Sequence, residues 1–521
     1  MSLRITLIAG AALTALATWA TPASAQSTDD IGVELLQLLV DEGVLKREKA
    51  EQLLVKARQA AALRAQSEKP ASASTINVPY VPQVVREQIR DEVKQEVVAQ
   101  AKSEGWIAPN TLPEWTKRIS ISGDMRVRYE MENYADDNFP FFPDIGAINL
   151  AGGVADADGF PLLNSLIDRH RVNYRARLDI NARISDQVRA GLRLASGNER
   201  GPVSTNATLG YFFLKDEFWL DRDYLDRFWV DRAYLEVEPV AGVVFTAGRM
   251  PNPFETTDMV WDDDINPEGV ALSARRQLID GLTVFGSAAY FPMEERGIYE
   301  DSFMVGGQLG ARAQLSDALS VELAGSYYDF HGIQSRKNAP DGSRLNDYTA
   351  PRFLEKGNSV FNIRTDGLTT LAGLASDYNL AIGRARLAYK AGPMEIALTG
   401  EAVKNLALDP AEVAALRGEP GVAPGDLGWQ VRLDAGFPKI ERFGQWQLGA
   451  AYKRIETDAV LDIFTDGDFG LGGTDVKGYL IEGSFGVYDN TWVGLSWFSS
   501  DAINRPPFSV DVLQLNLTTR F

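Results

Sequence analysis

The chain has 521 residues, no cysteine and a formal net charge of −19, from 52 lysines and arginines against 71 aspartates and glutamates. This acidic balance disfavours nucleic acid as a partner, because phosphate binding requires a basic face. Without cysteine there are no disulfides, so stability must come from packing or from a closed hydrogen-bond network.

Residues 1–25 have the pattern of a secretory signal peptide. Arg4 precedes an apolar run from Ile5 to Trp19, and Ala23-Ser24-Ala25 forms a small-residue cleavage site. An N-terminal membrane anchor is the alternative, but the run is short for a membrane span and the cleavage site argues for removal. We therefore expect an exported protein that loses residues 1–25.

Residues 26–66 carry apolar residues at helical spacing. Ile31 and Leu35 belong to a first stripe, Leu45 and Leu53 belong to a second, and Gly43 lies at the break between them. This pattern predicts a helical hairpin with one apolar face, which is too small to be stable alone. The hairpin is expected to pack on itself, on neighbouring protomers or on another partner.

A linker and a second helical segment are expected next. Residues 67–82 are rich in serine, alanine and proline, which is typical of a linker. Residues 83–113 begin as a helix whose narrow apolar stripe contains Val85, Ile89, Val93, Val97 and Ala101. The stripe fits either a coiled-coil stalk between protomers or a helix on the periplasmic rim of a barrel. Its spacing of four drifts from a heptad and weakens the first alternative.

From Ile119 onward the apolar pattern has a period of two. One face of residues 119–131 is apolar, with Ile119, Ile121, Met125, Val127, Tyr129 and Met131. The other face is polar, with Ser120, Ser122, Asp124, Arg126, Arg128 and Glu130. A half-buried strand of a soluble protein also alternates. Long alternating strands repeated to Phe521 instead predict a barrel with lipid outside and water inside.

About sixteen such strands are expected within residues 114–521. Their approximate positions are 119–133, 170–184, 187–196, 228–238, 243–249, 269–276, 282–290, 303–314, 320–330, 379–389, 394–403, 428–437, 444–454, 477–487, 491–498 and 510–521. Short links alternate with long ones, as in outer-membrane barrels. The sequence thus predicts an all-β transmembrane antiparallel barrel with both barrel ends, and therefore the N-terminal helices, on the periplasmic side.

Several segments resemble a known family. The last strand alternates and ends on Phe521, which is similar to the terminal strand that outer-membrane barrels present to their assembly machinery. The bacterial "putative porin" family is resembled by the following stretches: LLQLLVDEGVLKREKAEQLL, VPYVPQVVREQIRDEVKQEVVAQ, GWIAPNTLPEWTKRISISGDMRVRY, RAYLE and GRMPNPF. The resemblance implies a pore in the outer membrane of a Gram-negative bacterium, in contact with its lipid, and a homotrimer. It fixes no solute.

Arginines dominate the polar face of the first three strands. The set comprises Arg126, Arg128, Arg171, Arg175, Arg177, Arg183, Arg189 and Arg193. One interpretation is that these arginines keep the lumen polar and pair with Asp124, Glu130 and Asp179. The functional interpretation is a basic wall along the pore, because charge patches of this kind set ion selectivity.

The third long loop is acidic. It contributes Asp258, Asp262, Asp263, Asp264 and Glu268. A solvated surface loop is the simplest interpretation. By resemblance to general porins, whose third loop enters the pore, the loop is a candidate constriction. A Ca²⁺ or Mg²⁺ site is a third alternative, although no fixed ligand spacing supports it.

Enzyme chemistry finds little support in the sequence. The only two histidines, His170 and His331, are expected on nearly opposite walls, and no nucleophile–base pair or metal-ligand spacing is present. We expect no catalytic residues, metal or cofactor.

Two functions of different classes remain. The first is a porin that forms a water-filled channel for passive diffusion of small hydrophilic solutes or ions. The alternative is a structural or adhesive barrel whose lumen is plugged and whose periplasmic helices tether it to the cell wall, with peptidoglycan as the partner.

Overall fold

The computed structural model describes residues 114–197, 204–210, 228–418, 424–504 and 506–521. The chain divides into two compact units, residues 1–110 and 111–521, and every described residue belongs to the second. The predicted hairpin, linker and stalk, residues 26–113, all lie outside the described residues.

Sixteen antiparallel strands of the described unit close into a barrel. They are β1 (Ile119–Tyr134), β3 (Arg169–Arg183), β4 (Val188–Ser196), β6 (Phe228–Val240), β7 (Val243–Arg249), β8 (Glu268–Ile279), β9 (Leu282–Glu294), β10 (Ser302–Gln314), β11 (Leu319–His331), β15 (Asn379–Ala391), β16 (Met394–Asn405), β17 (Leu427–Gly436), β18 (Trp446–Ile455), β19 (Val476–Tyr488), β20 (Thr491–Ala502) and β21 (Ser509–Arg520). The predicted number and order of strands are confirmed, with bounds that move by a few residues.

Closure of the barrel depends on β1. This strand pairs with β3 on one side, where Val127 faces Tyr174, and with β21 on the other, where Val127 faces Leu517. Gly123 and Phe521 exchange two backbone hydrogen bonds of 3.0 and 3.1 Å at the end of this seam. Because the ring is complete, none of its strands is left as an unpaired edge.

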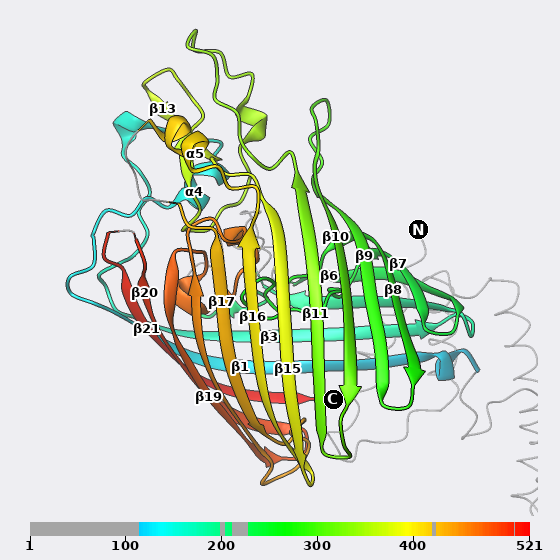
Figure 1. The fold of residues 1–521 in the computed structure, drawn as a ribbon. Helices are drawn as coiled ribbons and strands as arrows, with labels where there is room; N and C mark the ends of the chain where they lie inside the picture. Colours follow the sequence, from blue (N-terminus) through cyan, green and yellow to red (C-terminus); the bar gives the residue numbers. More distant parts are fainter. Residues whose placement is uncertain (1–113, 198–203, 211–227, 419–423, 505) are drawn as a thin grey trace, which may run out of the picture. The chain divides into compact units, whose positions relative to one another are not determined.

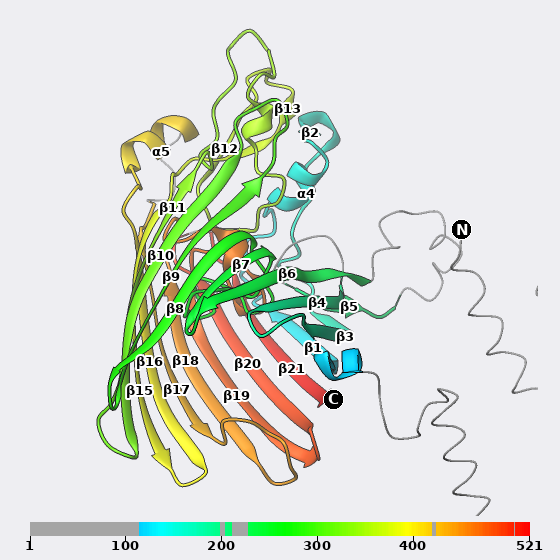
Figure 2. The same cartoon turned by 90° about the vertical axis from the view of Figure 1, so that its right-hand side faces the viewer.

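Connections differ at the two ends of the barrel. Figure 1 and Figure 2 show tight turns at one end and long connections at the other. Ile119 lies opposite Ala182, beside a tight turn, and the Arg520 amide donates to the carbonyl oxygen of Asn490 in another tight turn. Both ends of the barrel chain therefore lie on the side of the short turns, as the even strand number requires.

Alternation along each strand separates two faces. On β1, Ile121 exposes 63% of its surface and Met125 and Val127 are also exposed, whereas Asp124 and Arg128 are buried. Successive side chains of a strand point to opposite faces, so the apolar set faces outward and the charged set faces the lumen. The outward face is the one that meets lipid in barrels of this kind.

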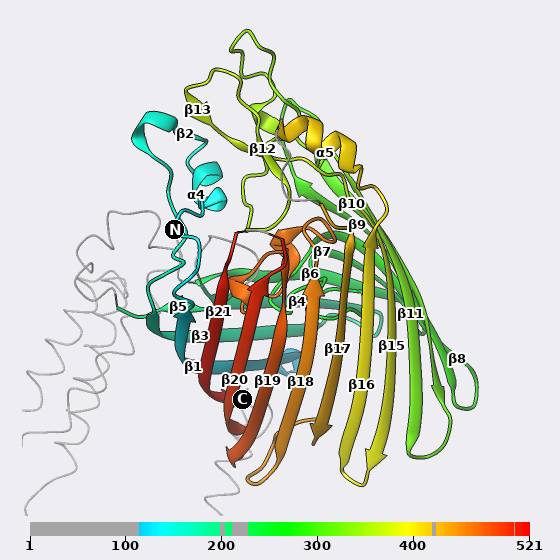
Figure 3. The same ribbon diagram turned by 60° about the vertical axis from the view of Figure 1, so that its left-hand side comes forward.

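The long connections contain smaller elements. These are the helices α4 (Ile145–Leu150) and α5 (Pro410–Arg417), the short strands β2 (Val154–Ala155), β5 (Ala207–Thr208), β12 (Val360–Asn362), β13 (Thr369–Thr370) and β14 (Ala372–Leu374), and the 3-10 helices η2 (Asp156–Asp158), η6 (Asp347–Thr349), η7 (Asp462–Phe464) and η8 (Phe469–Leu471). A further 3-10 helix, η1 (Glu114–Arg118), precedes β1. Figure 3 shows α4, α5, β12 and β13 beyond the strand ends.

Three long connections pack against one another and against the inner wall. They are loop 3 (residues 250–267), loop 5 (residues 332–378) and loop 7 (residues 456–475). Trp261 of loop 3 stacks on Phe464 of loop 7, with ring centroids 4.6 Å apart, and both join Phe291 and Tyr328 of the wall in one buried apolar cluster. This cluster gives the loops a core of their own inside the ring.

Candidate functional site

Arginines of the first two strands face one another across the ladder. Arg126 on β1 lies directly opposite Arg175 on β3, and Asp124 lies opposite Arg177. Like charges directly opposite each other are destabilising unless counter-charges intervene. Asp124 supplies one of these counter-charges, with distances of 3.0 Å to Arg175 and 2.7 Å to Arg177.

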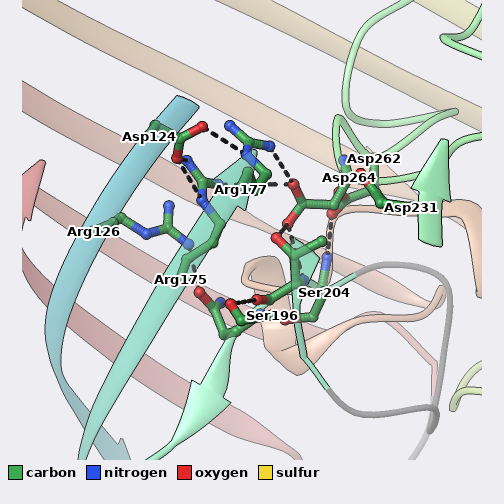
Figure 4. A network of polar contacts seen from close by, with 12 residues as sticks. Asp124, Arg126, Arg175, Arg177, Ser196, Ser204, Asp231, Asp262 and Asp264 are labelled. Carbon is green, nitrogen blue, oxygen red and sulfur yellow. Dashed lines mark hydrogen bonds and ion pairs between the residues drawn. The ribbon is translucent and has the colours of Figure 1, made fainter. Parts of the chain in front are cut away.

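Loop 3 supplies the second counter-charge. Its Asp264 lies 3.2 Å from the Arg177 guanidinium and 3.7 Å from that of Arg175, and it also accepts a hydrogen bond from the Thr205 hydroxyl (Figure 4). The two arginines are thus held between a wall carboxylate and a loop carboxylate. This arrangement brings together two sets of residues that the sequence analysis placed separately.

Arg126 and Arg128 meet different partners. Arg126 donates a hydrogen bond of 2.6 Å to the Asn206 side chain, and no carboxylate of the described residues lies within ion-pair distance of it. Arg128 is buried and donates to Asp468 of loop 7 at 2.9 and 3.0 Å. Two lumen loops therefore contact the same arginine face.

The other predicted arginines pair mainly with strand carboxylates. Arg171 contacts Glu130 and Glu132, Arg193 lies 2.8 Å from Asp179, and Arg189 lies 3.1 Å from Glu238. Arg183 is exposed at the turn end of β3. On the arginine face, some arginines thus pair with carboxylates of the barrel wall, and others contact the loops.

Loop 3 reaches strands far from its own ends. It connects β7 to β8, yet its Thr257 donates to Glu401 on β16 and its Asp258 lies 2.7 Å from Lys453 on β18. In the ring order, β16 and β18 lie across the barrel from β7 and β8. Because Asp264 meets β3, the loop contacts three separated parts of the inner wall.

The remaining acidic residues of this region differ in their surroundings. Asp262 accepts backbone hydrogen bonds from Asp264 and from Gly467 of loop 7, while Asp263 is exposed. Burial, followed by the nearby Asp466 and Asp264 carboxylates, raises the pKa of Asp262 well above its usual range. Glu268 was expected in the loop, but it is the first residue of β8, because ladder pairing with Arg249 on β7 begins there.

Comparison with known proteins identifies the family. The family model described as "Putative porin" matches residues 29–521. The chain belongs to the putative porin family. Family membership and the closed sixteen-strand barrel support an outer-membrane channel rather than an enzyme.

Solved structures of similar fold are distant in sequence. One is OmpF of Salmonella typhi in complex with daunomycin, which is 10% identical, with 77% of this chain and 97% of that chain covered and a TM-score of 0.41. Another is the outer membrane channel DcaP of Acinetobacter baumannii, at 11% identity, 77% and 97% coverage and a TM-score of 0.40. A third is a trimer form of OmpT of Vibrio cholerae, which is 11% identical, with 77% of this chain and 99% of that chain covered and a TM-score of 0.38. No curated protein sequence matches the chain.

Loop 7 is the part of this porin's site that the sequence analysis did not single out. Its Asp466 and Asp468 meet Lys453 and Arg128 on the wall. The run Asp466-Gly467-Asp468-Phe469 gives no local signal for this role, because phenylalanines such as Phe141 and Phe160 are exposed in another long loop.

The two histidines of this porin lie on separate walls, His170 on β3 and His331 on β11. The Nδ1 atom of His170 lies 2.8 Å from the Tyr129 hydroxyl, and His331 stacks on Phe303. Within residues 114–521, the described side chains form no cluster of three or more metal-ligating groups.

Proposed function

We propose that this porin forms a water-filled channel for passive diffusion of small hydrophilic solutes or ions. Its narrow part lies beside the cluster that the arginine face of β1 and β3 forms with the acidic loops 3 and 7. The observation that carries the proposal is the position of Asp264, on a loop that starts between β7 and β8, against Arg177 on β3. A loop held there lies so close to the wall that the charges of the loop and of the wall both act on an ion that passes nearby.

Charge then selects among ions only where the passage is narrow. Exposed charges are screened over about 8 to 10 Å at physiological salt. Arg126, Arg175 and Arg177 on the wall and Asp264 on the loop lie well within that range of one another. An ion that passes beside this cluster therefore experiences both signs of charge.

The test is the reversal potential across a planar bilayer under a salt gradient. Glutamine in place of Arg126, Arg128, Arg175 and Arg177 leaves Asp124, Asp264 and Asp468 without their counter-charges and should shift the preference toward cations. Asparagine in place of Asp262, Asp263 and Asp264 should shift it the other way. Lumen substitutions tune selectivity more than folding.

The exposed Arg183 at the turn end of β3 provides the control, and Arg183→Gln should leave the reversal potential unchanged. If both sets of variants conduct with the wild-type ion preference, the residues do not line the narrow part of the pore.

A structural role is the second candidate function. It is favoured by the apolar packing of the loops inside the ring, where Trp261, Phe464 and Phe469 are buried. Single-channel recording separates the two functions, because a plugged barrel would insert into the bilayer and pass no current.

We also propose that the protein is a homotrimer, folded by the barrel-assembly machinery through Phe521, with its N-terminal helices in the periplasm and peptidoglycan as their candidate partner. Resemblance to porins supports these points. Chemical crosslinking of the full mature chain in membranes should give a trimer, and crosslinking that gives only monomers would refute the oligomer.

A further inference from the structure

Lys453 on β18 is a charged side chain with no exposure to solvent. Its ammonium lies 2.7 Å from an Asp258 carboxylate oxygen and 2.8 Å from an Asp466 carboxylate oxygen, and 5.1 Å from the centre of the Phe469 ring. Removing an ammonium from water is costly unless its charge and its donors are satisfied. Two carboxylates and an aromatic face meet that requirement here.

The two carboxylates come from different loops, and these loops also bind each other. The Asp466 amide of loop 7 donates to the Asp258 carbonyl oxygen of loop 3 at 3.0 Å, and the Asp262 amide donates to the Phe464 carbonyl oxygen at 2.8 Å. The stacked rings of Trp261 and Phe464 lie beside these bonds. Loops 3 and 7 therefore form one joined body where they meet Lys453.

The joined loops touch the wall again at a second place, about a quarter of the way round the ring from β18. Asp264 of loop 3 meets Arg177 on β3, and Asp468 of loop 7 meets Arg128 on β1. Three strands, β19, β20 and β21, separate β18 from β1 in the ring. The pair of loops thus extends from Lys453 to the arginine face, and Lys453 is the point on β18 where both loops are held.

We propose that Lys453 is a positioning residue that fixes loops 3 and 7 as a single partition across the lumen, and that this partition sets the size limit for passing solutes. The inference rests on the channel function proposed above. Its physical basis is simple: Asp258 and Asp466 would repel each other without the ammonium between them, so the same charge that draws each loop to β18 also draws the loops together.

Replacing the ammonium tests the proposal. Lys453→Met keeps most of the side-chain length and removes the charge, so we expect a higher single-channel conductance and entry of larger sugars in a liposome-swelling assay. Lys453→Arg restores the charge and should return both quantities toward wild type. The matched control is Lys404→Met on β16, which breaks the 3.1 Å pair of Lys404 with Asp426 in the connection before β17; the Lys404 side chain is 56% exposed. This control should leave conductance and size limit unchanged.

A covalent link supplies the rescue. The chain has no cysteine, so an engineered pair has no competitor. Asp262→Cys with Gly467→Cys joins positions that already share a hydrogen bond of 3.1 Å, and Gly467 does not have a positive φ that would exclude a side chain. In the Lys453→Met background, oxidation should restore the conductance that the oxidised cysteine pair has with Lys453 in place, and a reductant should remove this rescue again.

The same cysteine pair gives a readout that needs no current. In detergent, the disulfide should form in higher yield with Lys453 than with Met at this position. Equal yields, or a folded Lys453→Met protein with wild-type conductance and size limit, would overturn the proposal. If wild type itself passes no current, the channel function fails, whereas the yields still test Lys453.

Folding is monitored by heat-modifiable gel mobility. Should Lys453→Met fail to fold because two half-buried carboxylates lose their partner, the triple variant with Asp258→Asn and Asp466→Asn removes all three charges together. The triple variant should show the same increases in conductance and size limit, and wild-type values for it would also overturn the proposal.

Discussion

Single charged side chains decide how the lumen of this porin is organised. The sequence identifies which residues face inward, because alternation is a local property: Arg126, Arg175 and Arg177 occupy one face by position alone. Their partners are not local. Asp264 is 87 residues from Arg177 along the chain, and Asp258 is 195 residues from Lys453, so no spacing rule pairs them. Lys453 looks like an ordinary polar strand residue until loops 3 and 7 are in place.

We expect the partition formed by loops 3 and 7 to be sensitive to pH through Asp466. Burial raises the pKa of Asp466 to about 6; Lys453 opposes this shift, while Asp258 and Asp468 add to it. In a state where the loops separate and water reaches this carboxyl, its pKa would be about 3.9. The closed state, in which loops 3 and 7 are joined, therefore binds the proton more tightly than the state with separated loops. It is stabilised relative to that state as pH falls from about 6 to 4.

The expected result is a conductance that decreases between pH 7 and pH 4 at constant salt. Asp466→Asn should reduce this decrease, and the raised pKa of Asp262 accounts for the part that remains. Asp186→Asn, in an exposed turn, should retain the full decrease. The measurement is single-channel conductance in a planar bilayer. A conductance that rises on acidification would contradict the assignment of the proton to the closed state.

At the scale of elements, strands and loops differ in how far the sequence predicts them. β7 was predicted at residues 243–249 and is found there, because a period-two run between turn residues defines a strand by itself. Loop 3 turns into the lumen because of tertiary contacts. In the sequence, Trp261 and Met259 resemble any apolar loop residues, and they become buried only by packing in one cluster with Phe464 and Tyr328. Loop order and acidity identified loop 3 as a candidate; nothing local identified loop 7.

One buried amide, that of Asn358, is central among several contacts between loop 5 and loop 7. The Asn358 side chain donates to the carbonyl oxygens of Thr457 and Val460 at 2.7 and 2.9 Å and accepts from the Asp462 amide at 2.8 Å. Asn358→Ala leaves these three backbone groups without that partner, and a buried unsatisfied group costs about 1–3 kcal/mol.

Asn358→Ala should therefore make loop 5 sensitive to protease added to intact cells, with the barrel still folded. Asn164→Ala removes a surface asparagine of the first long loop and should not have this effect. A variant with wild-type resistance would show that other contacts suffice to hold loop 5.

For the molecule as a whole, the barrel should not depend on the N-terminal segments. The composition of residues 67–82 and the change of period at Ile119 predict that the expected N-terminal helices fold separately from the barrel. A shortened chain that starts near Thr116, behind a signal sequence, should still insert into the outer membrane and conduct. Heat-modifiable mobility and bilayer recording measure both properties, and a shortened chain that aggregates would make the helices part of the folding unit.

The seam between β1 and β21 has a consequence for synthesis. Arg128 on β1 and Asn516 on β21 are hydrogen-bonded across 388 residues of chain. No ring can exist until the last strand has left the ribosome and crossed the inner membrane, since every earlier intermediate has two unpaired edges. Open edges pair readily with other chains. A chain that lacks the last dozen residues would thus keep fifteen of the sixteen strands but could not close the ring. We expect such a chain to aggregate, to stay bound to chaperones or to be degraded.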